Sequence, residues 1–340
     1  MPETRLLRPG LVMTILGTLL LAVLMISLMA GSIAIPPQEI GARLAKVVTQ
    51  WRCDDSTDQI LWMTRLPRIM LALLVGATMG MTGLASQTLF RNPLASPYIM
   101  GVSNGAAVGA VLGLLASSFV PYTLVPALSV FSGLTVSFLV FLLARRGGHF
   151  GQSLLLAGMA INAFCSSLTA GALYVAGERL QTLVFWLMGG LWQATWRDVL
   201  VMLPLCVICL IALRLLAPAM NVSLTGDRTA RDLGVNVVRL QRQLLVLIAV
   251  ATSVAVSLTG VIGFIGLVVP HLLRLAMGAD HRHLMPATAL GGAVLLLGAD
   301  TLARTVVAPA EIPVGILTAL IGAPVFLWML LRHGGGRAGE

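Results

Sequence analysis

The sequence has few charged residues and only one lysine. Of its 340 residues, 10% are charged and 58% are hydrophobic, and the mean hydropathy is +0.95. A soluble domain carries roughly 25% charged residues, so this chain cannot cover itself with a water-compatible surface. Lys46 follows Gly-Ala-Arg-Leu-Ala, which does not match the G-x-x-x-x-G-K-[ST] phosphate loop. The usual nucleotide-binding lysine is therefore excluded, and if ATP drives this protein, the ATPase is a separate chain.

Cysteine is also scarce. The chain has four cysteines, and three of them, Cys165, Cys206 and Cys209, lie inside apolar runs, which excludes a disulfide framework. Cys206-x-x-Cys209 has the spacing of a redox or metal site, but neither His nor an acidic residue is close in sequence, so helix packing is favoured. His281 and His283 are expected in an exposed polar turn. The sequence thus predicts no metal site and no cofactor bound by this chain.

Long apolar runs recur along the whole sequence. They predict an all-α polytopic membrane protein made of one transmembrane domain, residues 1–340. The first run is too long for the apolar region of a cleaved signal peptide, so it is expected to remain as a span. The seventh and eighth spans are separated at Gly260 and Gly263, which permit a tight reversal. Ten transmembrane helices are predicted, at about 11–35, 67–89, 97–117, 121–143, 152–176, 198–216, 242–260, 261–277, 285–307 and 312–332.

Two segments carry a more specific pattern. Residues 36–64 have apolar side chains at helical spacing opposite charged ones, which predicts a short helix lying in the membrane interface. These apolar side chains are Ile40, Leu44, Val47 and Trp51. In the third run small residues recur at every fourth position, which predicts close packing of two helix backbones. These are Gly101, Gly105, Gly109 and Gly113.

The distribution of basic residues predicts the orientation. An even number of spans puts both termini on the same side of the membrane. With cytoplasmic termini, fourteen of the 22 Lys and Arg residues lie on inner segments and eight on outer ones. This agrees with the positive-inside tendency, so the net charge of +9 is better explained by contact with membrane lipid than by nucleic acid.

Three of the outer arginines lie at the outer mouths of two spans: Arg65, Arg68 and Arg304. Two interpretations are open. The long side chains can snorkel to the lipid headgroups, or they can form a cationic platform for an acidic partner outside the membrane. Asp300 precedes Arg304 by one helical turn and is expected to pair with it.

The segment at about 217–241 is the most densely charged inner loop. Asp227 or Thr229 is expected to cap a short helix there, and Gly234 to end it. Such a helix is suited to docking into a groove of another subunit, although an ordinary solvated loop has the same composition.

Several motifs occur in an order that resembles the FecCD family, the permease subunits of type II ABC importers for ferric siderophores, haem and cobalamin. The resemblance covers about 80% of the chain, from the second span to the C-terminus. The motifs are RLPR (65–68), RNPLASP (91–97), GVSNGAA (101–107), LGV (233–235), GFIGLVVPHLLR (263–274), DHR (280–282), LGADTLAR (297–304) and EIPVGILTALIGAPVF (311–326).

The resemblance implies roles for particular residues. The outward arginines that meet acidic residues of a periplasmic binding protein match Arg65, Arg68 and Arg304, which favours the platform over snorkelling. The ATPase-coupling helices match the loop that contains Asp227, Arg231, Leu233, Gly234 and Val235. The cytoplasmic gate matches Gly151, Gln152 and Ser153. The cobalamin permease has small hydroxyl residues at this gate, so Gly151 and Gln152 depart from that pattern and disfavour cobalamin.

The resemblance also implies the partners. These are a second permease subunit, identical or a sister chain, two cytoplasmic ABC ATPases that hold the ATP, and a periplasmic substrate-binding protein, all at the bacterial inner membrane. Ferric siderophore is the expected cargo, with haem or cobalamin as alternatives. Two readings of other classes remain: an ion-coupled secondary transporter, which would use Asp300 and Glu311, and an intramembrane enzyme built on His271.

Overall fold

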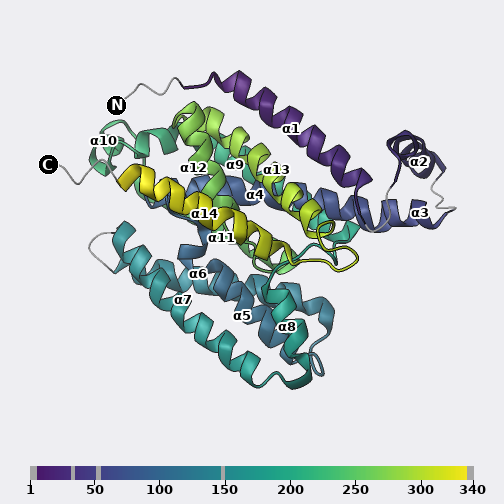
Figure 1. The fold of residues 1–340 in the computed structure, drawn as a ribbon. Coiled ribbons are helices and arrows are strands. Elements are labelled where there is room, and N and C mark those ends of the chain that lie inside the picture. The colour runs from purple at the N-terminus through teal and green to yellow at the C-terminus, as the bar shows by residue number, and fades with distance from the viewer. Residues whose placement is uncertain (1–5, 32–34, 51–54, 147–149, 335–340) are drawn as a thin grey trace.

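The computed structural model describes residues 6–31, 35–50, 55–146 and 150–334, and among these residues it has helices and no strand (Figure 1). Seven helical segments in this part of the chain are long and apolar enough to cross a membrane. They contain α1 (Pro9–Met29), α4 (Leu66–Leu89), α6 (Val125–Arg145), α7 (Phe150–Tyr174), α9 (Trp196–Ser223), α11 (Val237–Thr259) and α13 (His281–Ala303).

Three shorter apolar helices stand where the remaining spans were predicted. They are α5 (Val102–Leu115), α12 (Ile265–Met277) and the Val314–Trp328 part of α14 (Val314–Gly334). The predicted span 97–117 is a 3₁₀ turn, Pro97–Met100, followed by the 14-residue α5. At 1.5 Å per residue α5 is only about 21 Å long, shorter than the hydrocarbon layer of a bilayer. The all-helical polytopic fold is confirmed, whereas a count of ten membrane-crossing helices is not.

The predicted division of the seventh and eighth spans is confirmed. α11 ends at Thr259, and Gly260 follows with φ +67°. A Cβ at Gly260 would lie 2.2 Å from the carbonyl oxygen of Trp186, at the end of α8 (Leu180–Leu187). Glycine is therefore required both by the left-handed backbone and by the close approach of another segment.

The helices form two groups around a buried centre (Figure 1). α1, α9, α12 and α13 pack around α4, while α5, α6 and α7 pack against one another, and α11 contacts both groups. α4 lies in the middle, and nearly all of its residues from Leu71 to Leu89 are buried. The first turn of α1 and the last turn of α14 lie at the same end of the bundle as the short helix α10 (Asp227–Asp232).

Glycine allows α4 and α13 to touch through their backbones. A Cβ on Gly76 would lie 2.4 Å from the carbonyl oxygen of Gly292, and one on Gly80 would lie 2.2 Å from that of Thr288. Small residues four apart on both helices thus remove the side chains that would keep them separated. This contact makes α4 and α13 a tightly joined pair.

The glycines predicted to lie on one face of the third run also allow close contact between two helices. A Cβ on Gly105 would lie 2.6 Å from Cβ of Val136, and one on Gly109 would lie 2.4 Å from the carbonyl oxygen of Leu128, both on α6. The prediction of close backbone packing is confirmed, and α6 is the helix that it serves.

The helix predicted within residues 36–64 is α2 (Pro37–Gln50). Its Arg43 pairs with Glu39, with Asp55 and, at 2.7 Å, with the fully buried Asp58, which raises the pKa of Arg43. Ile40 is buried within the protein. Trp51 and the side chains of Leu44 and Val47 lie outside the described residues. Ion pairs to the segment before α4 therefore hold α2 in place.

Candidate functional sites at the two ends of the bundle

α4 connects two polar regions at opposite ends of the bundle. α3 (Ser56–Gln59) and a π-helical turn (Ile60–Arg65) lead directly into α4. The end where α4 begins, here called the arginine end, holds Arg65, Arg68 and Arg304. The end where α4 stops, here called the cavity end, opens into a cavity of about 1250 Å³. The 24 residues of α4 separate the two ends by about 36 Å.

At the arginine end, the guanidinium of Arg68 is shared between two carboxylates. Its Nε donates to both oxygens of Asp300, at 3.0 and 3.1 Å, and its Nη2 lies 2.9 Å from Oδ1. Its Nη1 donates to both oxygens of Glu311, at 3.0 and 2.9 Å. The two acids thus contact different nitrogens of one planar group: Asp300 takes Nε and Nη2, and Glu311 takes Nη1.

The other two arginines close the last turn of α1. Arg304 Nη2 donates to the carbonyl oxygen of Ser27 at 2.6 Å and to its hydroxyl at 2.5 Å, while Arg65 Nη1 donates to the carbonyl oxygen of Leu28 at 2.6 Å. The last carbonyls of a helix have no partner within the helix and attract cations. The predicted pairing of Asp300 with Arg304 is confirmed at 3.7 Å.

These contacts correct the expected direction of the arginine side chains. Snorkelling and an outer platform both require guanidinium groups that reach lipid headgroups or water. Instead, Arg65, Arg68 and Arg304 are only 3–7% exposed, because Asp300, Glu311 and the end of α1 surround them. A docking role for these arginines stays a prediction.

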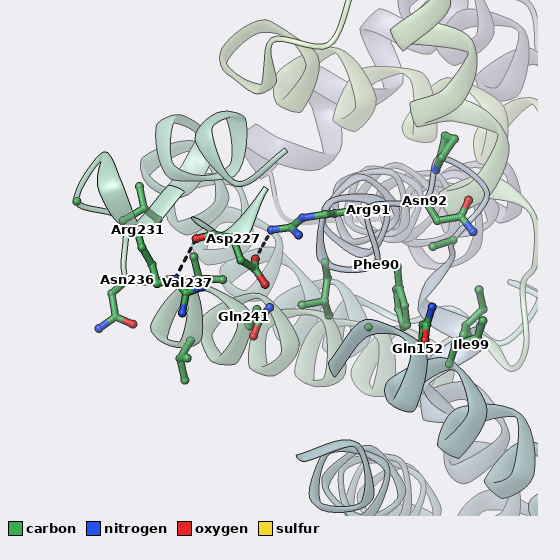
Figure 2. A pocket seen from close by; sticks show the side chains of 18 residues that line it. Phe90, Arg91, Asn92, Ile99, Gln152, Asp227, Arg231, Asn236, Val237 and Gln241 are labelled. Atoms are coloured by element: carbon green, nitrogen blue, oxygen red, sulfur yellow. Dashed lines mark hydrogen bonds and ion pairs between the residues drawn. The ribbon is translucent and has the colours of Figure 1, made fainter. Parts of the chain in front are cut away.

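At the cavity end, the cavity is lined by residues from α4, α7, α10 and α11 and the segments next to them (Figure 2). Six of the residues predicted for coupling or gating belong to this lining. They are Gly151, Gln152, Asp227, Arg231, Gly234 and Val235. Two predicted residues do not: Ser153, the third gate residue, is half-buried, and Leu233 is 64% exposed. The structure therefore brings the predicted gate and the predicted coupling loop together around one space.

The short helix α10, which contains the predicted coupling residues, is joined to the segment after α4 by an ion pair. Arg91 Nη2 binds the carboxylate of Asp227, and Arg231 Nε donates to the carbonyl oxygen of Asp227 at 3.1 Å (Figure 2). The expected caps are wrong, because α10 begins at Asp227 after Gly226 and has no side-chain cap. The expected end is confirmed, since Gly234 follows α10 with φ +82°.

A polar cluster around the buried His281 fastens three helices near the same end. The ring nitrogens of His281 lie 2.7 Å from Oγ1 of Thr88 and 2.6 Å from Oδ1 of Asn221. Asn221, in the last turn of α9, also donates to Asp280 at 2.7 Å. The backbone N–H of Arg282 and the Asn221 amide lower the pKa of Asp280. The expectation of an exposed turn is wrong for His281, which is fully buried.

The described part of the chain contains no group of three or more His, Cys, Asp or Glu arranged to hold a metal ion. His271 is buried in α12 and is not among the residues that line the cavity.

Sequence reasoning missed several residues of both sites. The sequence suggested Glu311 only as part of an ion-coupled transporter, and it suggested no partner for Arg91. Their partners, Arg68 and Asp227, are 243 and 136 residues away in the chain. Arg91 belongs to the motif RNPLASP and Glu311 to the motif EIPVGILTALIGAPVF. Membership in a motif does not show which residues pair over such separations in the chain.

The fold and the two polar ends define a class of protein: a multi-pass helical membrane protein with a passage-like cavity at one end and no phosphate-loop motif in its sequence. The comparisons with known proteins are more specific. The FecCD transport family matches residues 19–332. The hemin transport system permease protein HmuU of Yersinia pestis is 44% identical over 336 residues, with 94% of this chain and 96% of that protein covered.

Two further relatives agree. The vitamin B12 import system permease protein BtuC of Klebsiella pneumoniae subsp. pneumoniae is 40% identical over 327 residues, with 94% and 93% covered. A solved structure described as an inward-facing conformation of a metal-chelate type ABC transporter matches with a TM-score of 0.83 and 32% identity, over 95% of this chain and 99% of that chain. The chain belongs to the FecCD transport family, and its fold is that of a type II ABC importer permease.

Proposed function

We propose that this chain is one half of the membrane passage of an ATP-driven importer, which carries an iron chelate from the periplasm into the cytoplasm across the bacterial inner membrane. One observation carries the proposal. The coupling loop and the gate, identified from separate parts of the sequence, line the same cavity, and the Arg91–Asp227 ion pair joins α10 to the end of α4. A movement imposed on α10 from below would therefore pass to the end of α4, which borders the same cavity as the gate residues.

The proposed orientation puts the cavity end in the cytoplasm. The first turn of α1 and the last turn of α14 lie at this end, so cytoplasmic termini agree with the excess of basic residues on inner segments. Two ABC ATPases would bind ATP and press on α10, and this chain would bind no cofactor. The arginine end would then face the periplasmic binding protein, and a second permease subunit would complete the passage.

Ferric siderophore is the proposed cargo, following the family's commonest use. Haem is the second candidate, because a hemin permease is 44% identical to this chain. A vitamin B12 permease is 40% identical, and such close values give little preference between the two tetrapyrroles. The lack of small hydroxyl residues at Gly151 and Gln152 disfavours cobalamin.

The test is uptake into proteoliposomes that contain the permease, its ATPase and its binding protein. We expect uptake of labelled ferric siderophore that requires ATP inside the cytoplasmic compartment and the binding protein on the opposite side. Haem and cobalamin serve as competing cargoes in the same assay. Uptake by the permease alone, driven by a proton gradient, would overturn the proposal and support the ion-coupled transporter.

A further inference from the structure

The two carboxylates that hold Arg68 differ in how firmly they are fixed. Asp300 lies on α13, is fully buried, and also neighbours Arg304 at 3.7 Å. Glu311 lies in the segment between α13 and α14, and its side chain is 38% exposed. Removing Asp300 would leave the buried Arg304 without its carboxylate and Arg68 with Glu311 alone. Removing Glu311 would only return a partly solvated carboxylate to water.

The two acids also take different edges of the guanidinium. Asp300 binds the Nε and Nη2 edge, which faces the helix bundle. Glu311 covers Nη1. An acidic side chain that arrives from outside can therefore take Nη1 without disturbing the Asp300 contact, provided that Glu311 moves away.

We infer that Glu311 binds Arg68 where a partner's carboxylate would bind. On docking, the partner's carboxylate replaces Glu311, while Asp300 keeps the guanidinium in position. This inference rests on the proposed docking role of the arginine end. It reconciles that role with the burial of Arg68, because the cation is held ready by one internal acid and covered by another. Asp300 acts as a positioning residue, and Glu311 sets how strongly an acidic partner must compete.

The test compares Glu311→Gln with Glu39→Gln in the complete transporter. Both substitutions remove one partly exposed negative charge at the arginine end, but Glu39 pairs with Arg43 on α2 and does not touch the cluster. Affinity for the transporter's own binding protein is measured with each variant in nanodiscs. We expect Glu311→Gln to tighten binding by about threefold to fivefold, the range of a partly exposed ion pair, and Glu39→Gln to change it by less than about twofold.

A double-mutant cycle with Arg68→Lys separates this exchange from a general change of charge. Lysine keeps the charge beside Asp300 but lacks the second edge that Glu311 covers. We expect Arg68→Lys to weaken binding and to abolish the effect of Glu311→Gln. Glu311→Asp, which keeps the charge on a shorter side chain, should give a smaller gain, and thermal unfolding of each variant checks that the fold is unchanged.

The outcomes distinguish a failure of the docking role from a failure of the exchange. If Arg68→Lys leaves the affinity unchanged, the docking role of the arginine end is wrong. If Arg68→Lys weakens binding while Glu311→Gln does not differ from Glu39→Gln, docking stands and the exchange is wrong. An effect of Glu311→Gln that persists in the Arg68→Lys background would also overturn the exchange, because it would then arise from long-range charge alone.

Discussion

The charged side chains at the two ends of this bundle differ in how far they are exposed. At the arginine end, the side chain of Arg68 is 7% exposed and both of its partners belong to this chain. At the cavity end, the Arg91 and Asp227 side chains are 37% and 48% exposed and border an open space. Removing one member of an enclosed charge pair destabilises a protein strongly, whereas exposed charges beside a cavity contribute little to stability and remain accessible to another molecule.

The largest expected effect is on the enclosed charges. Asp300→Ala leaves two buried arginines without their common carboxylate, so we expect the free energy of unfolding to fall by about 3–5 kcal/mol. Chemical denaturation of the purified permease in detergent would measure it. Glu311→Gln, whose side chain is partly solvated, should cost less than about 1 kcal/mol in the same assay. Equal losses for the two variants would remove the contrast between the two acids.

A smaller loss is expected in the region between the two ends. Gly80→Ala puts a methyl group 2.2 Å from the carbonyl oxygen of Thr288, so α4 and α13 must move apart. We expect a loss of about 1–3 kcal/mol, as for other overpacked contacts. Gly17→Ala on α1 is the control, because its Cβ would have no neighbour within 4 Å and alanine favours the helix. Gly80→Ala with unchanged thermal unfolding would mean that the backbones are not in contact.

The smallest effect on stability, with a distinct effect on transport, is expected at the cavity end. Arg91→Glu puts two negative charges together, but exposed pairs are weak, so unfolding should change by less than about 1 kcal/mol. ATP-driven uptake should fall about tenfold, a coupling of ~1.4 kcal/mol, and the added exchange Asp227→Arg should restore most of it. Uptake that stays low in the double variant would exclude this ion pair as the link between α10 and α4.

Local pattern was sufficient for the helices but not for their pairing. The reversal at Gly260 and the packing face of Gly105 and Gly109 were predictable, because both depend on residues close in sequence. α5 was predicted too long, since hydropathy cannot distinguish a 3₁₀ turn from the helix that follows it. The type of helix is decided there by Gly101, with φ +75°, which separates the two elements.

The sequence predicted which residues belong to the two sites, but not how deeply each of them is buried. Gln152 and Asp227 were identified from motifs, and both line the cavity. The burial of Arg68 was not foreseen, because it depends on Asp300 and Glu311, which lie 232 and 243 residues further along the chain. Sequence position gives the ends of helices, but only the packing of α1, α4 and α13 decides whether a charge at such an end faces water or another charge.

The glycine contact between α4 and α13 limits how this protein can change shape. Two helices whose carbonyl oxygens rest on each other's α-carbons cannot roll or slide past one another without a steric clash. Any rearrangement must therefore carry them together, and a tilt imposed beside Arg91 would reappear, some 36 Å away, at Arg68.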